Sequence, residues 1–198
     1  DRAVSPQVLK NLNEAYNLDA SNWEQYLDYM SGLVRGDLGP SFRFPGRSVS
    51  EMISTGLPVT FELAFYAILI ALVMGVISGV IAALKRNTYL DFIPMAVAMM
   101  GICVPTFLMG PLLVLIFGIN LEILPVSGWG QLAGDKILPS LTLGFAYAAY
   151  IARLSRGGML EILNQDFIRT ARAKGLSESM GVMKHAMQGG LIPVVSFL

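Results

Sequence analysis

The sequence predicts an all-α, polytopic membrane protein built as a bundle of transmembrane helices. Of the 198 residues, 54% are hydrophobic and only 14% are charged, whereas a typical soluble domain is about 25% charged. The second observation is three uncharged runs, at residues 63–84, 92–121 and 137–152. The two longer runs can cross a hydrocarbon core of about 30 Å at 1.5 Å per helical residue.

Residues 1–56 are expected to form a water-exposed segment ahead of the membrane domain. The apolar side chains of Trp23, Tyr26, Leu27 and Met30 recur at i, i+3, i+4 and i+7, which predicts a helix. Glycine and proline in residues 35–46 then predict a loop.

Residues 57–198 are expected to form the transmembrane domain. We predict spans at about 57–84, 92–121, 136–156 and from 186 to 198 onward, with a cytoplasmic coupling region at 157–185. The second span contains Pro94, Pro105 and Pro111, so we expect kinks or turns in it. Because the chain opens on Asp1 and closes within an apolar run, we expect further segments at both ends.

Lysine and arginine predict the orientation. Eight of the 14 bases lie in residues 85–91 and 153–184, a denser set than the six in 1–56 and 122–136. The denser side is expected to be cytoplasmic, which places the amino-terminal segment outside. The balanced net charge of +0 gives no indication of nucleic-acid binding.

The basic stretch DFIRTARAKG, residues 166–175, has the ends of a short helix. Asp166 suits the N-cap, Arg172 and Lys174 suit the last turn, and Gly175 suits a left-handed C′ position. Ser177 is expected to cap a second helix. From the residues alone, docking to a soluble partner and lying on anionic lipid are about equally plausible.

The same stretch resembles a signature of ATP-binding-cassette importers. DFIRTARAKGLSE, followed by KHAMQGGLIPVVSF, is similar to the cytoplasmic motif of their permease subunits, the inner-membrane components of binding-protein-dependent transport. Arg169-Thr170-Ala171 stands where the general motif has E-A-A, Gly175 is in register, and Pro193 comes five residues late. GDLGPSF, GVIAALKRNTYLD, ILPSLTLGF and ARLSRGGMLEILNQ further resemble the B-type permeases of oligopeptide and dipeptide systems.

The resemblance implies the type I importer permease fold and a role in ATP-driven peptide import across the bacterial inner membrane. It implies a second permease subunit, two cytoplasmic ATPases that bind ATP-Mg, and an extracytoplasmic peptide-binding protein. The sequence has no G-x-x-x-x-G-K-[ST] loop, so no cofactor, metal or catalytic residue is expected in this chain. Dipeptides, nickel or another small solute are alternative substrates within the family.

The resemblance also implies which residues contact the ATPase, although ordinary positive-inside charge is an alternative reading of each base. Pairing within the chain with Arg156 or Arg169 is the alternative for Glu161 and Asp166, and we favour it for Glu161. The role of His185 stays open between an ATPase contact and an interfacial histidine. The predicted coupling residues are Asp166, Arg169, Thr170, Ala171, Arg172, Lys174, Gly175 and Leu176.

A translocation path and a packing motif complete the candidate sites. Glu62 is an acid beside a span, a candidate functional position, and snorkelling to water is equally plausible. Met99 and Met100, with Pro105, suggest a soft, kinked wall; an ordinary apolar core is the alternative. Gly75 and Gly79 form G-x-x-x-G, a close helix-packing pattern that a permease–permease interface can use.

Three readings from other classes compete with an importer permease. A secondary transporter needs buried ionisable relays, and no span has a central acid, base or histidine. A non-transporting scaffold that anchors a soluble partner through residues 161–188 stays open. A membrane enzyme is disfavoured because the sequence shows no nucleophile–base or metal cluster.

Overall fold

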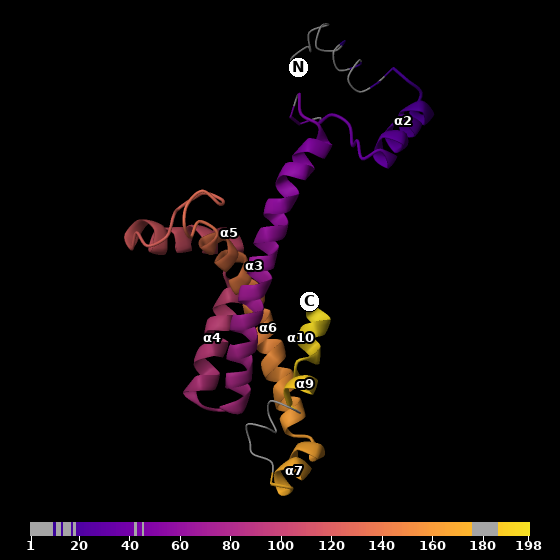
Figure 1. Cartoon of the computed structure of the whole chain (residues 1–198). Coiled ribbons are helices and arrows are strands. Elements are labelled where there is room, and N and C mark those ends of the chain that lie inside the picture. Colours follow the sequence, from indigo (N-terminus) through magenta and orange to yellow (C-terminus); the bar gives the residue numbers. More distant parts are fainter. Residues whose placement is uncertain are drawn as a thin grey trace. The chain divides into compact units, whose positions relative to one another are not determined.

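A computed structural model describes residues 10, 13, 17, 19–41, 43, 44, 46–175 and 186–198 of the chain. Within this part the regular elements are helices, with one isolated bridge between Pro40 and Ser48. The expected all-α class is therefore confirmed. The chain divides into two compact units, Asp1–Phe61 and Glu62–Leu198, and each is described separately below (Figure 1).

The first unit contains helix α2, Asn22–Val34, which the spacing of Trp23 and Met30 predicted. Its start is fixed by a capping box. The Glu24 amide donates to Ser21 Oγ at 3.3 Å, and the Ser21 amide donates to Glu24 Oε2 at 2.9 Å. The Ser21 backbone hydrogen bond holds the pKa of Glu24 below its usual value. Two free donors of the first turn are thus satisfied locally.

Helix α3, Val49–Leu84, has 36 residues and runs from the first unit into the second. It and α6, Ile137–Leu163, are long and apolar enough to span a membrane. Along the chain, three elements separate α3 from α6: α4 (Tyr89–Cys103), α5 (Thr106–Leu113) and the π-helix η1 (Val114–Asn120). The expected spans 57–84 and 136–156 fall on α3 and α6.

The expected span 92–121 is sharply bent, by 111°, between α4 and the helical stretch Thr106–Asn120. The break falls at Val104 and Pro105. Val104 has φ −86° and ψ 118°, the extended conformation that a following proline favours. Pro94 and Pro111 stand inside helices. Of the three prolines in this stretch, Pro105 therefore sets the change of direction.

Small residues bring α3 and α6 together. A Cβ added at Gly75 would lie 2.7 Å from Ile151 Cβ, and one at Gly79 would lie 2.5 Å from the Ala152 carbonyl oxygen. On α6, a Cβ at Gly144 would lie 2.9 Å from a carbonyl oxygen of α3. The two backbones approach so closely that side chains at these positions have no room. The G-x-x-x-G motif of α3 thus faces a helix of the same chain.

Helix α6 is the centre of the second unit. It contacts α4, α5, α9 (Met187–Gly190) and α10 (Ile192–Phe197). Against α4 it packs Ala149 and Ala152 on Ala98, and Phe145 fills the space beside Gly101. At its carboxyl end Gly158 faces the Gly190 backbone. Helix α6 is therefore the common packing partner of α4, α5, α9 and α10.

Candidate functional site

The basic segment predicted from the sequence forms a short helix, α7, Asp166–Ala173, directly after α6 (Figure 1). Ile168 is its anchor, because its side chain is only 3% exposed. It packs in one cluster with Ala83 of α3, Met159 of α6 and Ala186. One apolar residue therefore seats α7 against two membrane-spanning helices and the segment before α9.

The two ends of α7 can be compared with their predictions. Asp166 is the first helical residue, so the N-cap predicted there is one residue out. The Gln165 carbonyl instead accepts from the Ile168 amide at 3.1 Å, and the Asp166 carboxylate lies in the first turn, where the helix dipole favours it. The end is as predicted, because Gly175 has φ 83°, in the left-handed region.

The side of α7 away from Ile168 is polar and open. Arg169 and Asp166 form an exposed pair at 3.6 Å, which is the alternative that the sequence offered for Asp166, and such surface pairs contribute little. Thr170 Oγ1 donates to the Asp166 carbonyl at 3.0 Å. Ala171 is half-buried, and Lys174 and Gly175 are exposed.

Four other predicted positions have no side-chain description in the structure. Arg172 belongs to α7 by its backbone. Leu176 and His185, like the cap predicted at Ser177, lie outside the described residues. The contact of this surface with an ATPase stays a prediction.

An ion pair that sequence reasoning missed lies near the same end of α6. Arg156 donates twice to Asp91 at the start of α4, from Nε at 2.6 Å and from an Nη atom at 2.8 Å. The Asn87 amide donates to the same carboxylate at 3.0 Å. Asp91 is 1% exposed. Arg156 was one of two bases named as partners for Glu161 and Asp166, but its bidentate partner is Asp91, and Asp166 pairs with Arg169 instead.

At the amino-terminal end of α6, Glu62 joins α3 to the loop 121–136. Trp129 Nε1 donates to Glu62 Oε2 at 3.1 Å, and Lys136 forms an ion pair with the same carboxylate. The Lys136 ammonium also lies 5.4 Å from the centre of the Trp129 ring, within cation–π range. The sequence marked Glu62 but gave no partner for it.

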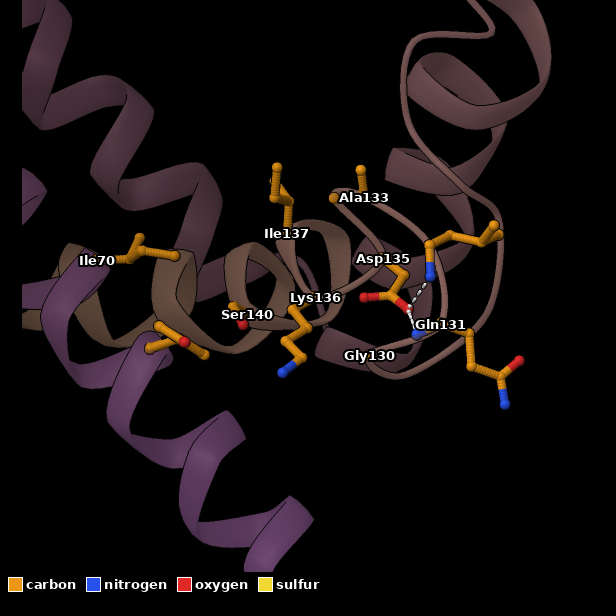
Figure 2. Close-up of a pocket in the computed structure, with 11 residues that line it drawn as sticks. Ile70, Gly130, Gln131, Ala133, Asp135, Lys136, Ile137 and Ser140 are labelled. Carbon is orange, nitrogen blue, oxygen red and sulfur yellow. Dashed lines mark hydrogen bonds between the residues drawn. The ribbon is translucent and has the colours of Figure 1, made fainter.

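A cavity of about 640 Å³ lies beside this cluster (Figure 2). Figure 2 shows Asp135 turned toward the backbone of its own loop, while Lys136 extends away from it. The amides of Gln131 and Leu132 donate to Asp135 Oδ2 at 2.9 and 3.1 Å, and chiefly the Leu132 bond lowers the pKa of Asp135. Ser140 also lines the cavity, and its buried hydroxyl has no hydrogen-bond partner among the described residues.

The other residues of the expected path lie on the bent span. Met99 and Met100 belong to α4 and are 58% and 56% exposed, and Pro105 precedes α5. Glu62 contacts Trp129 and Lys136, whereas the two methionines present their side chains on the surface of this chain. Among the described residues, no group of three His, Cys, Asp or Glu side chains could hold a metal ion.

Comparison with known proteins shows the family to which the chain belongs. A family described as "binding-protein-dependent transport system inner membrane component" matches residues 75–198, which include α6, α7 and most of the helices around them. The chain belongs to this family. The family resemblance read from the basic segment is thereby confirmed, as are its membrane class and its place among transport components.

Individual relatives point to peptide systems. The oligopeptide transport system permease protein OppB of Haemophilus influenzae is 44% identical, and that of Escherichia coli 43% identical, over 100% of this chain. The dipeptide transport system permease protein DppB of Bacillus subtilis is 42% identical over 100% of this chain. The chain spans 65% of the length of the first two relatives and 64% of the third.

Proposed function

We propose that this chain is the major part of a permease subunit of an ATP-driven peptide importer, and that α7 receives the motion of a cytoplasmic ATPase. The observation that supports this most directly is the seating of Ile168. Its side chain is 3% exposed between α3 and α6, while the opposite side of α7 is polar and open. A rigid helix held in this way transmits a push on its outer side to both spans.

The outer side of α7 suits close contact with another protein. Ala171 is small, and a Cβ added at Gly175 would meet nothing within 4 Å, so a partner surface has room to approach the backbone there. Arg169 and Lys174 supply positive charge at the rim for acidic groups of the partner. ATP-Mg is proposed to bind in the ATPase chains, because this sequence has no phosphate-binding loop.

The proposed substrate is a peptide, by similarity to relatives whose names specify oligopeptide or dipeptide transport. The proposed assembly contains a second permease subunit, two ATPases and an extracytoplasmic peptide-binding protein. The proposed orientation puts α7 in the cytoplasm and residues 1–56 outside, because lysine and arginine are denser in 85–91 and 153–184. The loop 121–136 is then extracytoplasmic.

Cysteine cross-linking tests the docking of α7. In a Cys103→Ser background, Ala171→Cys is expected to cross-link to a co-expressed ATPase subunit, with a yield that changes when nucleotide is added. Leu132→Cys is the control, because it is 58% exposed but lies in the loop before the opposite end of α6. Absence of any Ala171→Cys adduct in correctly inserted protein would refute the docking of α7. Equal yields from both positions would do the same.

A further inference from the structure

The Asp91–Arg156 pair lies where three helices meet α6. Asp91 is in the first turn of α4, directly after the short connection 85–88 from α3. Arg156 is one helical turn before Met159, which packs on Ile168 of α7. A single stretch of α6 therefore contacts both the start of α4 and the anchor of α7.

The contact of α3 with the same stretch is equally close. A Cβ added at Gly79 would lie 2.6 Å from Ser155 Cβ and 3.1 Å from the Arg156 amide nitrogen. Four residues on, Ala83 joins the cluster that contains Met159 and Ile168. The α3–α4 hairpin is thus held on both sides of its turn, by packing from α3 and by an ion pair from α4.

The ion pair differs in kind from the rest of the α4–α6 contact. Elsewhere these helices meet through apolar packing, of Ala98 on Ala149 and Ala152 and of Phe145 beside Gly101, contacts that include no directional bond. The Arg156 guanidinium instead makes two parallel bonds of 2.6 and 2.8 Å, which fix orientation as well as distance. Separating the pair would leave the carboxylate of Asp91 buried without its partner, a costly state.

We propose that Asp91 and Arg156 are positioning residues for transport, which lock the α3–α4 hairpin to α6 so that the hairpin moves with α7 as one body. This inference rests on the proposed function. It adds a route for the motion received by α7. The motion passes through the Asp91–Arg156 pair to α4, and α4 passes it on to the bend at Pro105. When the pair is lost, ATP hydrolysis continues, but the motion that α7 receives reaches the transmembrane path poorly.

Distance measurement within this chain tests the lock directly. Spin labels are attached at Lys85→Cys and Gln165→Cys, both exposed positions outside the proposed coupling residues, in Cys103→Ser full-length protein within the complete importer in liposomes. With Asp91 present, we expect a narrow distance distribution that is the same with and without nucleotide. In Asp91→Asn the distribution is expected to broaden and to depend on nucleotide. Peptide uptake per ATP hydrolysed is expected to fall about fivefold or more.

Three variants serve as controls. Glu51→Gln removes an exposed acid whose partner, Arg47, lies 3.4 Å away, and it should change neither readout. Arg156→Lys keeps the charge but loses the two-pronged geometry, so it should resemble Asp91→Asn. The exchange Asp91→Arg with Arg156→Asp restores opposite charges at the two positions, so it should recover part of the uptake-to-hydrolysis ratio that the single variants lose.

The outcomes separate this inference from the proposed function. If Asp91→Asn changes neither the distance distribution between the labels nor the uptake-to-hydrolysis ratio, the pair does not lock the α3–α4 hairpin to α6. If Asp91→Asn does not assemble, Arg156→Lys decides by the same two measurements. If the protein with both residues intact neither binds an ATPase nor transports peptide, the proposed function fails. The label distances without nucleotide then still test whether the pair fixes the hairpin.

Discussion

Trp129 donates a 3.1 Å hydrogen bond to Glu62 across 67 positions of sequence. This bond, with the ion pair from Lys136 to the same carboxylate, ties the loop 121–136 to α3. Both charged side chains are about one-third exposed, at 35% for Glu62 and 31% for Lys136. Water and salt therefore screen the ion pair, and we expect the indole hydrogen bond to matter most for holding the loop.

Replacing Glu62 is expected to release Trp129. In a Trp23→Phe background, which leaves Trp129 as the remaining tryptophan, Glu62→Ala should make the indole emission more accessible to acrylamide. Glu62→Gln should have a smaller effect, because its amide oxygen can still accept from Nε1. Glu51→Ala is the control for loss of an acid from α3. Equal quenching in Glu62→Ala and the parent would show that Glu62 does not hold Trp129.

The close approach of α3 and α6 predicts a sharp positional effect on stability. Gly79→Ala places a Cβ 2.5 Å from the Ala152 carbonyl oxygen, so the helices must move apart, at a cost of about 1–3 kcal/mol. Gly56→Ala is the matched control on the same helix, because a Cβ there meets nothing within 4 Å. Gly56→Ala should stabilise the protein slightly, since alanine is a better helix former than glycine. Thermal unfolding in detergent measures both, and equal midpoints would disprove the close approach.

Asp135 predicts a pH dependence of the loop 121–136. Its folded pKa is lowered, first by the Leu132 amide, so its contribution is complete above the unfolded value of about 3.9. That contribution is lost as the pH falls through the lower folded value. We expect the Trp129 emission to change at acid pH with Asp135 and to change less in Asp135→Asn. Identical acid titrations of the two proteins would exclude a role for Asp135.

Local patterns were sufficient to predict α2 and the end of α7. The spacing of Trp23 and Met30 gave α2, and the glycine at 175 gave the left-handed end of α7. The break at Pro105 was anticipated as one of three possible kinks, but its size was not, because proline inside a helix is tolerated at Pro94 and Pro111. A kink angle depends on packing that local sequence does not encode.

The tertiary ion pairs were beyond sequence reasoning for a different reason. Asp91 and Arg156 are 65 positions apart, and Glu62 and Lys136 are 74 apart. Neither spacing corresponds to a helical or strand period, so no local rule joins the partners. An acid directly before the apolar run 92–121 was the available signal for Asp91, and it does not identify a partner.

Gly175 gives the most direct mutational test of the proposed coupling surface. Its φ of 83° is strained for most side chains, by about 1–2 kcal/mol, and the space beside it is open for a partner. Gly175→Arg adds both strain and bulk, whereas Gly175→Asn adds a small side chain that tolerates this conformation. We expect Gly175→Arg to abolish most peptide uptake while membrane insertion stays normal and ATP hydrolysis continues. Gly175→Asn should retain more uptake than Gly175→Arg.

Gly175→Ala separates the two causes, because it adds strain with almost no bulk. If strain at the end of α7 dominates, Gly175→Ala should lose more uptake than Gly175→Asn. If partner approach dominates, uptake should fall with side-chain size, from alanine through asparagine to arginine. Uptake into liposomes and ATP hydrolysis are measured on the same preparations. Full uptake by Gly175→Arg would mean that no partner surface approaches this end of α7.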